Sequence, residues 1–176
     1  MTIKQAIIDS GAVEYMESRQ NTLWAGTLFE NYTILDPKKK GNVGEMVVSS
    51  ILKANGHKEE PAPNNAGYDR IVSPTGTALP DAQPLKVEIK FSLSNTDTKN
   101  SKIKLHHYTF NHIGEHKDWH RLIFAGMHPE YEKSVVSWMS KETFSEILAT
   151  GEYFSRQQGG KDGTNDDFMI TGAKFI

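Results

Sequence analysis

The chain has 176 residues, 37% hydrophobic and 24% charged, with no cysteine; this is typical of a globular domain and excludes disulfides, thiolate zinc sites and cysteine nucleophiles. Twenty Lys and Arg against 22 Asp and Glu give a net charge of −2, so no overall field draws the protein to nucleic acid or to a membrane. The apolar runs are too short to cross a bilayer and no secretory signal opens the chain, so we expect a cytoplasmic protein with no membrane partner.

The first predicted elements are helical. Residues 2–19 are expected to form a helix interrupted near positions 10 and 11, and residues 21–37 are aromatic-rich and irregular. A second helix is expected to begin at Gly41-Asn42 and to end at Asn55-Gly56. Its apolar residues recur at helical spacing: Val43, Val47, Val48, Ile51 and Leu52.

Strands dominate the chain after this second helix. The predicted elements are strands over 57–62, 68–72 and 86–93, a helix over 105–113, strands over 121–127 and 134–139, a helix over 141–150 and a last strand over 168–170. This order predicts an α/β (α+β) fold with a mixed central sheet flanked by helices.

One group of residues suggests chemistry. The segment 86–93 alternates polar and apolar side chains without a break, which places Glu88 and Lys90 on one face of a strand. Asp69 stands at the start of the preceding strand, so pairing of the two strands would let Asp69 and Glu88 share one Mg²⁺ ion with a main-chain carbonyl and waters.

Such a site would suit phosphodiester hydrolysis. A bound metal supplies an activated water and neutralises phosphoryl oxygens, and Lys90 beside it would orient the nucleophile or stabilise the charge of the transition state. The alternative for Glu88 and Lys90 is a solvent-facing ion pair without function.

The sequence resembles the PD-(D/E)XK phosphodiesterases, which include type II restriction endonucleases. The matching segments are Gly41-Asn42-Val43-Gly44-Glu45, Tyr68-Asp69 and Glu88-Ile89-Lys90, with Tyr68 where the family motif has proline. The resemblance implies a restriction-endonuclease-like core over 40–127. In it, Asp69, Glu88 and the Ile89 carbonyl bind Mg²⁺ (or Mn²⁺), Lys90 acts in cleavage, and Glu45 joins the site, as its counterpart does in some members.

The same resemblance implies double-stranded DNA as substrate and, because one site cuts one strand, a homodimer. We treat 1–176 as one domain, in which residues 1–36 are an N-terminal extension that offers a dimer surface and residues 128–176 add strand, helix and loop elements. The residues expected to contact DNA lie in a turn, a basic stretch and a glycine-rich tail: Asn64, Asn65, Lys99, Lys102, Lys104, Gln158 and Lys161.

Several alternatives stay open. The core could serve a junction-resolving, repair or nicking nuclease, or a DNA-binding subunit without catalysis. His112, His116 and His120 are spaced by four, which on a helix would place them on one face that could suit zinc. The plainest alternative is an α/β protein with a histidine-rich surface and no nucleic-acid role.

Overall fold

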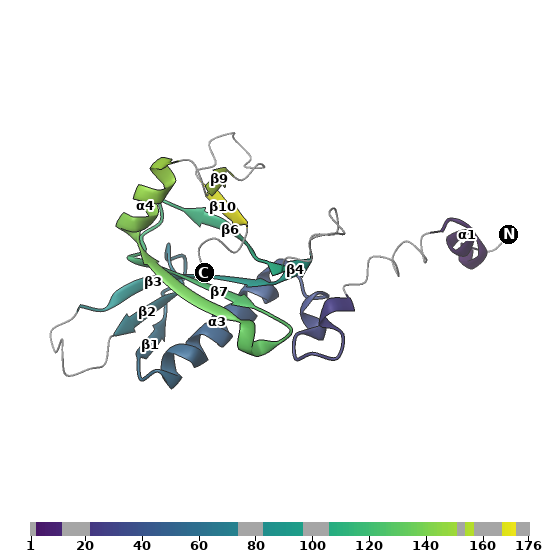
Figure 1. Cartoon of the computed structure of the whole chain (residues 1–176), viewed down its shortest axis with the longest axis horizontal. Helices are drawn as coiled ribbons and strands as arrows, with labels where there is room; N and C mark the ends of the chain where they lie inside the picture. The colour runs from purple at the N-terminus through teal and green to yellow at the C-terminus, as the bar shows by residue number, and fades with distance from the viewer. Residues whose placement is uncertain are drawn as a thin grey trace. The chain divides into compact units, whose positions relative to one another are not determined.

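The computed structural model describes residues 3–11, 22–73, 83–96, 106–150, 154–156 and 167–171 (Figure 1). The chain divides by its contacts into two units, Met1–Leu35 and Asp36–Ile176. Within the described ranges, no helix has both the length and the apolar character that a membrane crossing needs.

The first unit contains short helical segments: α1 (Ile3–Asp9), η1 (Thr22–Trp24) and η2 (Glu30–Tyr32). Its aromatic rings pack edge to face, with ring centroids 5.8 Å apart for Trp24 and Phe29 and 6.2 Å apart for Phe29 and Tyr32. The aromatic-rich stretch therefore forms a small cluster. The rest of the helix predicted over 2–19 lies largely outside the described residues.

A five-stranded mixed sheet organises the second unit, in the order β1-β2-β3-β7-β8. Its strands are β1 (Lys58–Pro61), β2 (Arg70–Ser73), β3 (Leu85–Leu93), β7 (Arg121–Met127) and β8 (Val135–Ser140), with the turn η3 (Tyr131–Lys133) before β8. β3 and β7 run parallel and the other neighbours antiparallel. The predicted mixed α/β class and mixed sheet flanked by helices are thus confirmed.

Helix α3 (Pro37–Ala54) covers one face of this sheet (Figure 1). The prediction that it begins at Gly41-Asn42 is wrong, because the helix begins four residues earlier at Pro37, which suits the first turn. Asp36 caps it by accepting a 2.9 Å hydrogen bond from the Lys39 amide. The helix approaches β3 closely at Gly44, where an added Cβ would lie 2.8 Å from Cγ of Phe91.

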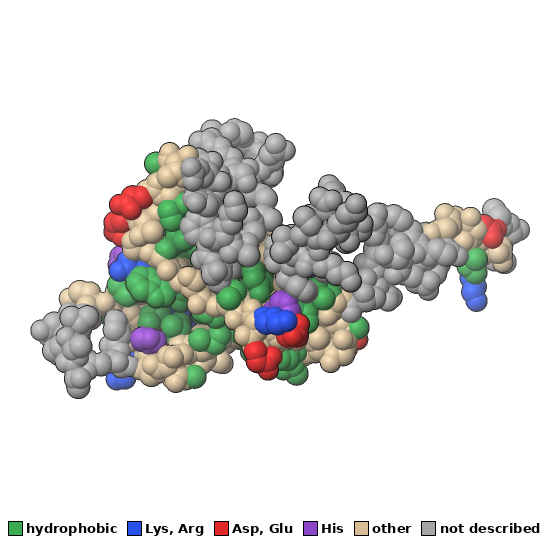
Figure 2. Space-filling view, viewed as in Figure 1, with side chains coloured by type: hydrophobic (Ala, Val, Ile, Leu, Met, Phe, Trp, Pro, Cys, Tyr) green, Lys and Arg blue, Asp and Glu red, His purple; other side chains and the backbone are tan. Residues whose placement is uncertain are grey.

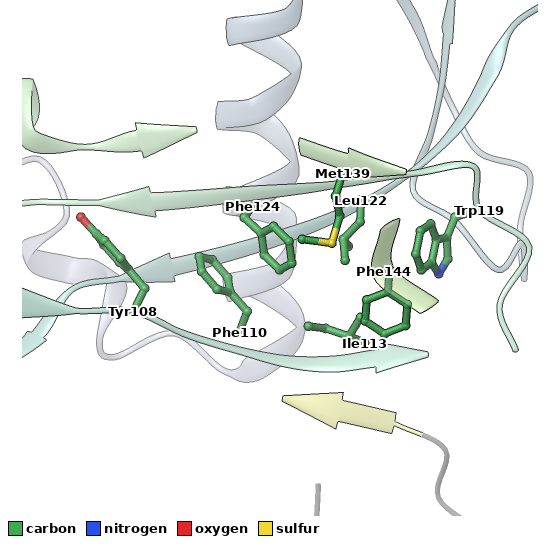
Figure 3. Packing of buried hydrophobic residues seen from close by; sticks show 8 residues of the cluster. All are labelled: Tyr108, Phe110, Ile113, Trp119, Leu122, Phe124, Met139 and Phe144. Atoms are coloured by element: carbon green, nitrogen blue, oxygen red, sulfur yellow. The ribbon is translucent and has the colours of Figure 1, made fainter. Parts of the chain in front are cut away.

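The opposite face of β7 and β8 carries the main core (Figure 3). It is covered by α4 (Lys141–Thr150) and by β6 (Thr109–Gly114), which pairs with β10 (Asp167–Thr171) and through it with β9 (Phe154–Arg156). β4 (Asn95–Thr96) and β5 (His106–His107) form a separate pair. The buried cluster consists of Tyr108, Phe110, Ile113, Trp119, Leu122, Phe124, Met139 and Phe144.

The helix predicted over 105–113 is wrong, because this segment forms β5 and β6 instead. Tyr108 and Phe110 are buried on alternate positions, which is the period of a strand, and β6 finds its partner in β10 far along the sequence. The helical stacking of His112, His116 and His120 fails for the same reason, since His112 lies on β6 and the other two in the connection that follows it.

Candidate functional site

The candidate site begins at the fork where β2 and β3 separate. The two strands pair only from Arg70 to Val72, and Asp69 directly precedes this pairing. The Asp69 amide donates to the Val87 carbonyl at 2.9 Å, and its carboxylate Oδ2 accepts a 2.7 Å hydrogen bond from the Ile89 amide. The Asp69 side chain thus replaces a ladder partner for β3 and is fixed against the Glu88-Ile89-Lys90 segment.

Glu88 and Lys90 lie on the same face of β3, next to Leu122 and Phe124 of β7 in the strand register. The Lys90 ammonium is 2.7 Å from Glu88 Oε1, and their side chains are only 13% and 5% exposed. A carboxylate buried to this degree requires a counter-charge, because its desolvation is otherwise unfavourable by several kcal/mol. The Glu88–Lys90 ion pair is therefore largely buried and does not face solvent.

The surroundings of Asp69 disfavour its ionised form. Its pKa is raised from 3.8 to about 6, mainly by burial and also by the negative charges of Glu88 and Glu45, while the Ile89 amide and Lys90 oppose this shift. The ionised form of Asp69 therefore lacks sufficient nearby positive charge. A cation placed among these carboxylates would lower this pKa.

Glu45 projects from α3 and is held by Arg70, a residue that the sequence reasoning did not select. Arg70 Nη1 donates to Glu45 Oε2 at 2.7 Å and to the Asp69 carbonyl at 2.8 Å. Arg70 Nε donates to Ser49 Oγ at 3.2 Å. It also lies 3.1 Å from Glu59 Oε2, and this second contact is an ion pair and not a hydrogen bond. Arg70 thereby links α3, β1 and β2 beside Asp69.

Lys117 is the second residue that the sequence reasoning missed. It comes from the connection between β6 and β7, and its ammonium lies 3.0 Å from Glu88 Oε1. Nothing in the local sequence around Lys117 indicates that this connection folds back onto β3.

Only some of the residues predicted to contact DNA lie in the part of the chain that the structure describes. Asn64 and Asn65 are exposed in the turn before Asp69, and Asn65 adopts a φ of 63°, which asparagine tolerates. The remaining predicted contacts lie outside the described residues: Lys99, Lys102, Lys104, Gln158 and Lys161.

The oxygen atoms beside the fork are of the kind that hard divalent cations prefer. Across the described ranges, no group of three or more His, Asp or Glu side chains is placed to hold a metal. Two carboxylates and one carbonyl, from Asp69, Glu88 and Ile89, are nevertheless the kind of small ligand set with which Mg²⁺ keeps most of its water. The raised pKa of Asp69 is the feature that such an ion would relieve.

A separate pocket of about 250 Å³ lies on the α3 side of the sheet, opposite Glu88 and Lys90. Apolar residues predominate in its lining: Leu52, His57, Val72, Leu85, Val87, Arg121, Ile123 and Trp138. Trp138 is 66% exposed at its rim, and Figure 2 shows hydrophobic side chains gathered on this part of the surface. Because it lies away from the carboxylates, this pocket is not part of the candidate site.

No family model matches the chain, and no curated protein is significantly similar to it.

Proposed function

We propose that the protein is a metal-dependent endonuclease that hydrolyses phosphodiester bonds of double-stranded DNA, on a restriction-endonuclease-like core of the PD-(D/E)XK type. The observation that carries the proposal is the 2.7 Å hydrogen bond from the Ile89 amide to Asp69. It fixes Asp69, the residue directly before β2, against the Glu88-Ile89-Lys90 segment of β3, next to the Glu88 carboxylate and the Lys90 ammonium.

Mg²⁺, with Mn²⁺ as a substitute, is the proposed cofactor, held by Asp69, Glu88 and the Ile89 carbonyl. When bound, such an ion supplies an activated water and neutralises charge on phosphoryl oxygens. The hydrogen bond from Ile89 orients Asp69 and leaves its second oxygen free of this contact. Glu45, held by Arg70 at the end of its side chain, adds negative charge near Asp69 and thereby favours cation binding.

Lys90 has the position required of the residue that assists the attacking water. Its ammonium is fixed 2.7 Å from Glu88 on a rigid strand, with little solvent around it. Positive charge at such a site stabilises the negative charge that develops in the transition state, because a preorganised group with low solvent exposure is screened little.

DNA is the proposed partner, and a homodimer the proposed assembly, since each chain has one site and a duplex has two strands. A type II restriction endonuclease is the form of this activity that we favour. Cutting of four-way junctions or single nicks irrespective of sequence would instead indicate a resolving, repair or nicking enzyme.

The test is plasmid cleavage with Mg²⁺, with and without EDTA, by the wild type, Lys90→Ala and the control Lys133→Ala. Lys133 pairs with Glu130 on an exposed turn, so its removal matches the charge change away from the site. We expect discrete cutting that EDTA abolishes, that Lys90→Ala slows by about 100- to 1,000-fold, and that Lys133→Ala leaves unchanged. Equal cutting by the Lys90 variant would refute the mechanism, and no cutting of duplexes, nicks or junctions would refute the nuclease.

A further inference from the structure

Glu88 receives positive charge from two directions. Lys90, two residues along the same strand, lies 2.7 Å from Glu88 Oε1, and Lys117, from the connection between β6 and β7, lies 3.0 Å from the same oxygen. The Lys117 side chain is 26% exposed, twice as much as that of Lys90. Two ammonium groups therefore share one oxygen, and the more exposed of them lies on a turn.

The backbone around Lys117 is fixed by several contacts. The Lys141 ammonium of α4 donates to the Lys117 carbonyl, and a Cβ at Gly67 would lie 2.9 Å from the Asp118 amide. Gly67 comes two residues before Asp69, so the connection that carries Lys117 and the segment that carries Asp69 approach each other without intervening side chains.

The Lys117 side chain is also guided to Glu88. Its stem runs along Gly114, where an added Cβ would lie 2.9 Å from Lys117 Cγ. Its ammonium donates to the carbonyl of His112 at 3.2 Å. His112 adopts a φ of 55°, an uncommon conformation that histidine, like asparagine and aspartate, takes more readily than other residues with a side chain.

We propose that Lys117 is a second active-site lysine that balances Glu88 until a divalent cation binds there and then contacts a phosphate oxygen of the DNA. This inference rests on the proposed function. A divalent cation and two ammonium groups cannot share one carboxylate without strong repulsion. Lys117 is the group that yields, because its side chain is 26% exposed and its ammonium can move to solvent or phosphate, whereas the Lys90 side chain is 13% exposed.

The first test measures Mn²⁺ affinity by calorimetry in the absence of DNA. Removal of a competing positive charge should tighten Mn²⁺ binding, so we expect Lys117→Met to bind about tenfold more tightly than the wild type. Lys133→Met changes the net charge equally at a distant turn and should leave the affinity unchanged. A residue that only stabilises the fold would alter the melting temperature without this gain in affinity.

The second test measures single-turnover DNA cleavage at saturating Mg²⁺. We expect Lys117→Met to cut about 100-fold more slowly despite its tighter metal binding, because a charge contact to phosphate is lost, and Lys117→Arg to recover part of the rate. Gly114→Ala retains every functional group, but its Cβ would lie 2.9 Å from both Lys117 Cγ and His116 Cε1, so it should displace the Lys117 stem and shift both measurements in the same directions. If Lys117→Met does not fold, Gly114→Ala provides the test in its place.

The outcomes separate the two proposals. If the wild type binds Mn²⁺ and cuts DNA but Lys117→Met and Gly114→Ala match it in both measurements, Lys117 has no part in the site and only this inference is overturned. If the wild type neither binds Mn²⁺ nor cuts DNA, the proposed function fails and this inference fails with it.

Discussion

Replacement of Asp69 by asparagine should stabilise the protein at neutral pH. Asparagine has the same shape and retains an oxygen that can accept the hydrogen bond from the Ile89 amide. It removes a negative charge that burial and the neighbouring Glu88 and Glu45 disfavour. Residues of functional sites often lower stability, so the same change should also abolish the proposed metal-dependent activity.

The magnitude follows from the pKa of Asp69. A carboxyl whose pKa rises from 3.8 in the unfolded chain to about 6 in the folded one holds its proton more tightly when folded. The free energy of unfolding therefore falls as the pH rises from 3.8 to about 6, by about 3 kcal/mol in all. Relaxation around the partly exposed side chain reduces this value, so we expect Asp69→Asn to gain about 1–3 kcal/mol at pH 7 and nothing near pH 4.

Urea denaturation of both proteins from pH 4 to pH 8, without divalent cations, measures this difference. Asp118→Asn is a control of opposite sign, because the hydrogen bond from Lys86 lowers the pKa of Asp118 in the folded state. Asp118→Asn should therefore lower the free energy of unfolding at neutral pH, and this effect should become smaller as the pH falls. A difference between wild type and Asp69→Asn that does not vary with pH, or a less stable variant at pH 7, would refute the electrostatic argument.

Two further predictions concern the framework of the site. Gly44→Ala should lower the free energy of unfolding by about 1–3 kcal/mol, because its Cβ would collide with Phe91; Gly41→Ala in the same helix meets no atom within 4 Å and should gain about 0.5–1 kcal/mol. Equal effects in urea denaturation would contradict the close packing of α3 on β3. Arg70→Met should lose about 3 kcal/mol, since it leaves the carboxylate of Glu59, which is 5% exposed, without this cation. The double variant Arg70→Met/Glu59→Gln should recover part of that loss, and no recovery would show that the ion pair is not the cause.

Local sequence patterns predict several of the elements. The alternation over 86–93 corresponds to β3, and the segments 121–127 and 141–150 correspond to β7 and α4. Prediction fails at β6, whose histidine spacing resembles a helix. Its strand conformation depends on pairing with β10, more than fifty residues away, and on packing of Phe110 against Phe124 at a centroid distance of 4.9 Å. Such long-range contacts leave no periodic signal in the segment itself.

The candidate site shows the same limit. Asp69, Glu88 and Lys90 follow from strand alternation and adjacency in the chain. Arg70 and Lys117 do not, because each acts through a residue distant in sequence, Arg70 on Glu45 and Lys117 on Glu88. The fold alone brings these cations to their carboxylates.

The charges around the fork bear on the proposed binding of a divalent cation and then of DNA. The group contains four carboxylates, Asp69, Glu88, Glu45 and Glu59, and four cationic side chains, Lys90, Lys117, Arg70 and Lys53. The group is formally neutral, but its cations lie on Glu88, Glu45 and Glu59, and Asp69 has the raised pKa. In the proposed order, the divalent cation binds first, beside Asp69. Its two added charges would then leave the group positive, and phosphate groups of DNA are the partners that would restore neutrality.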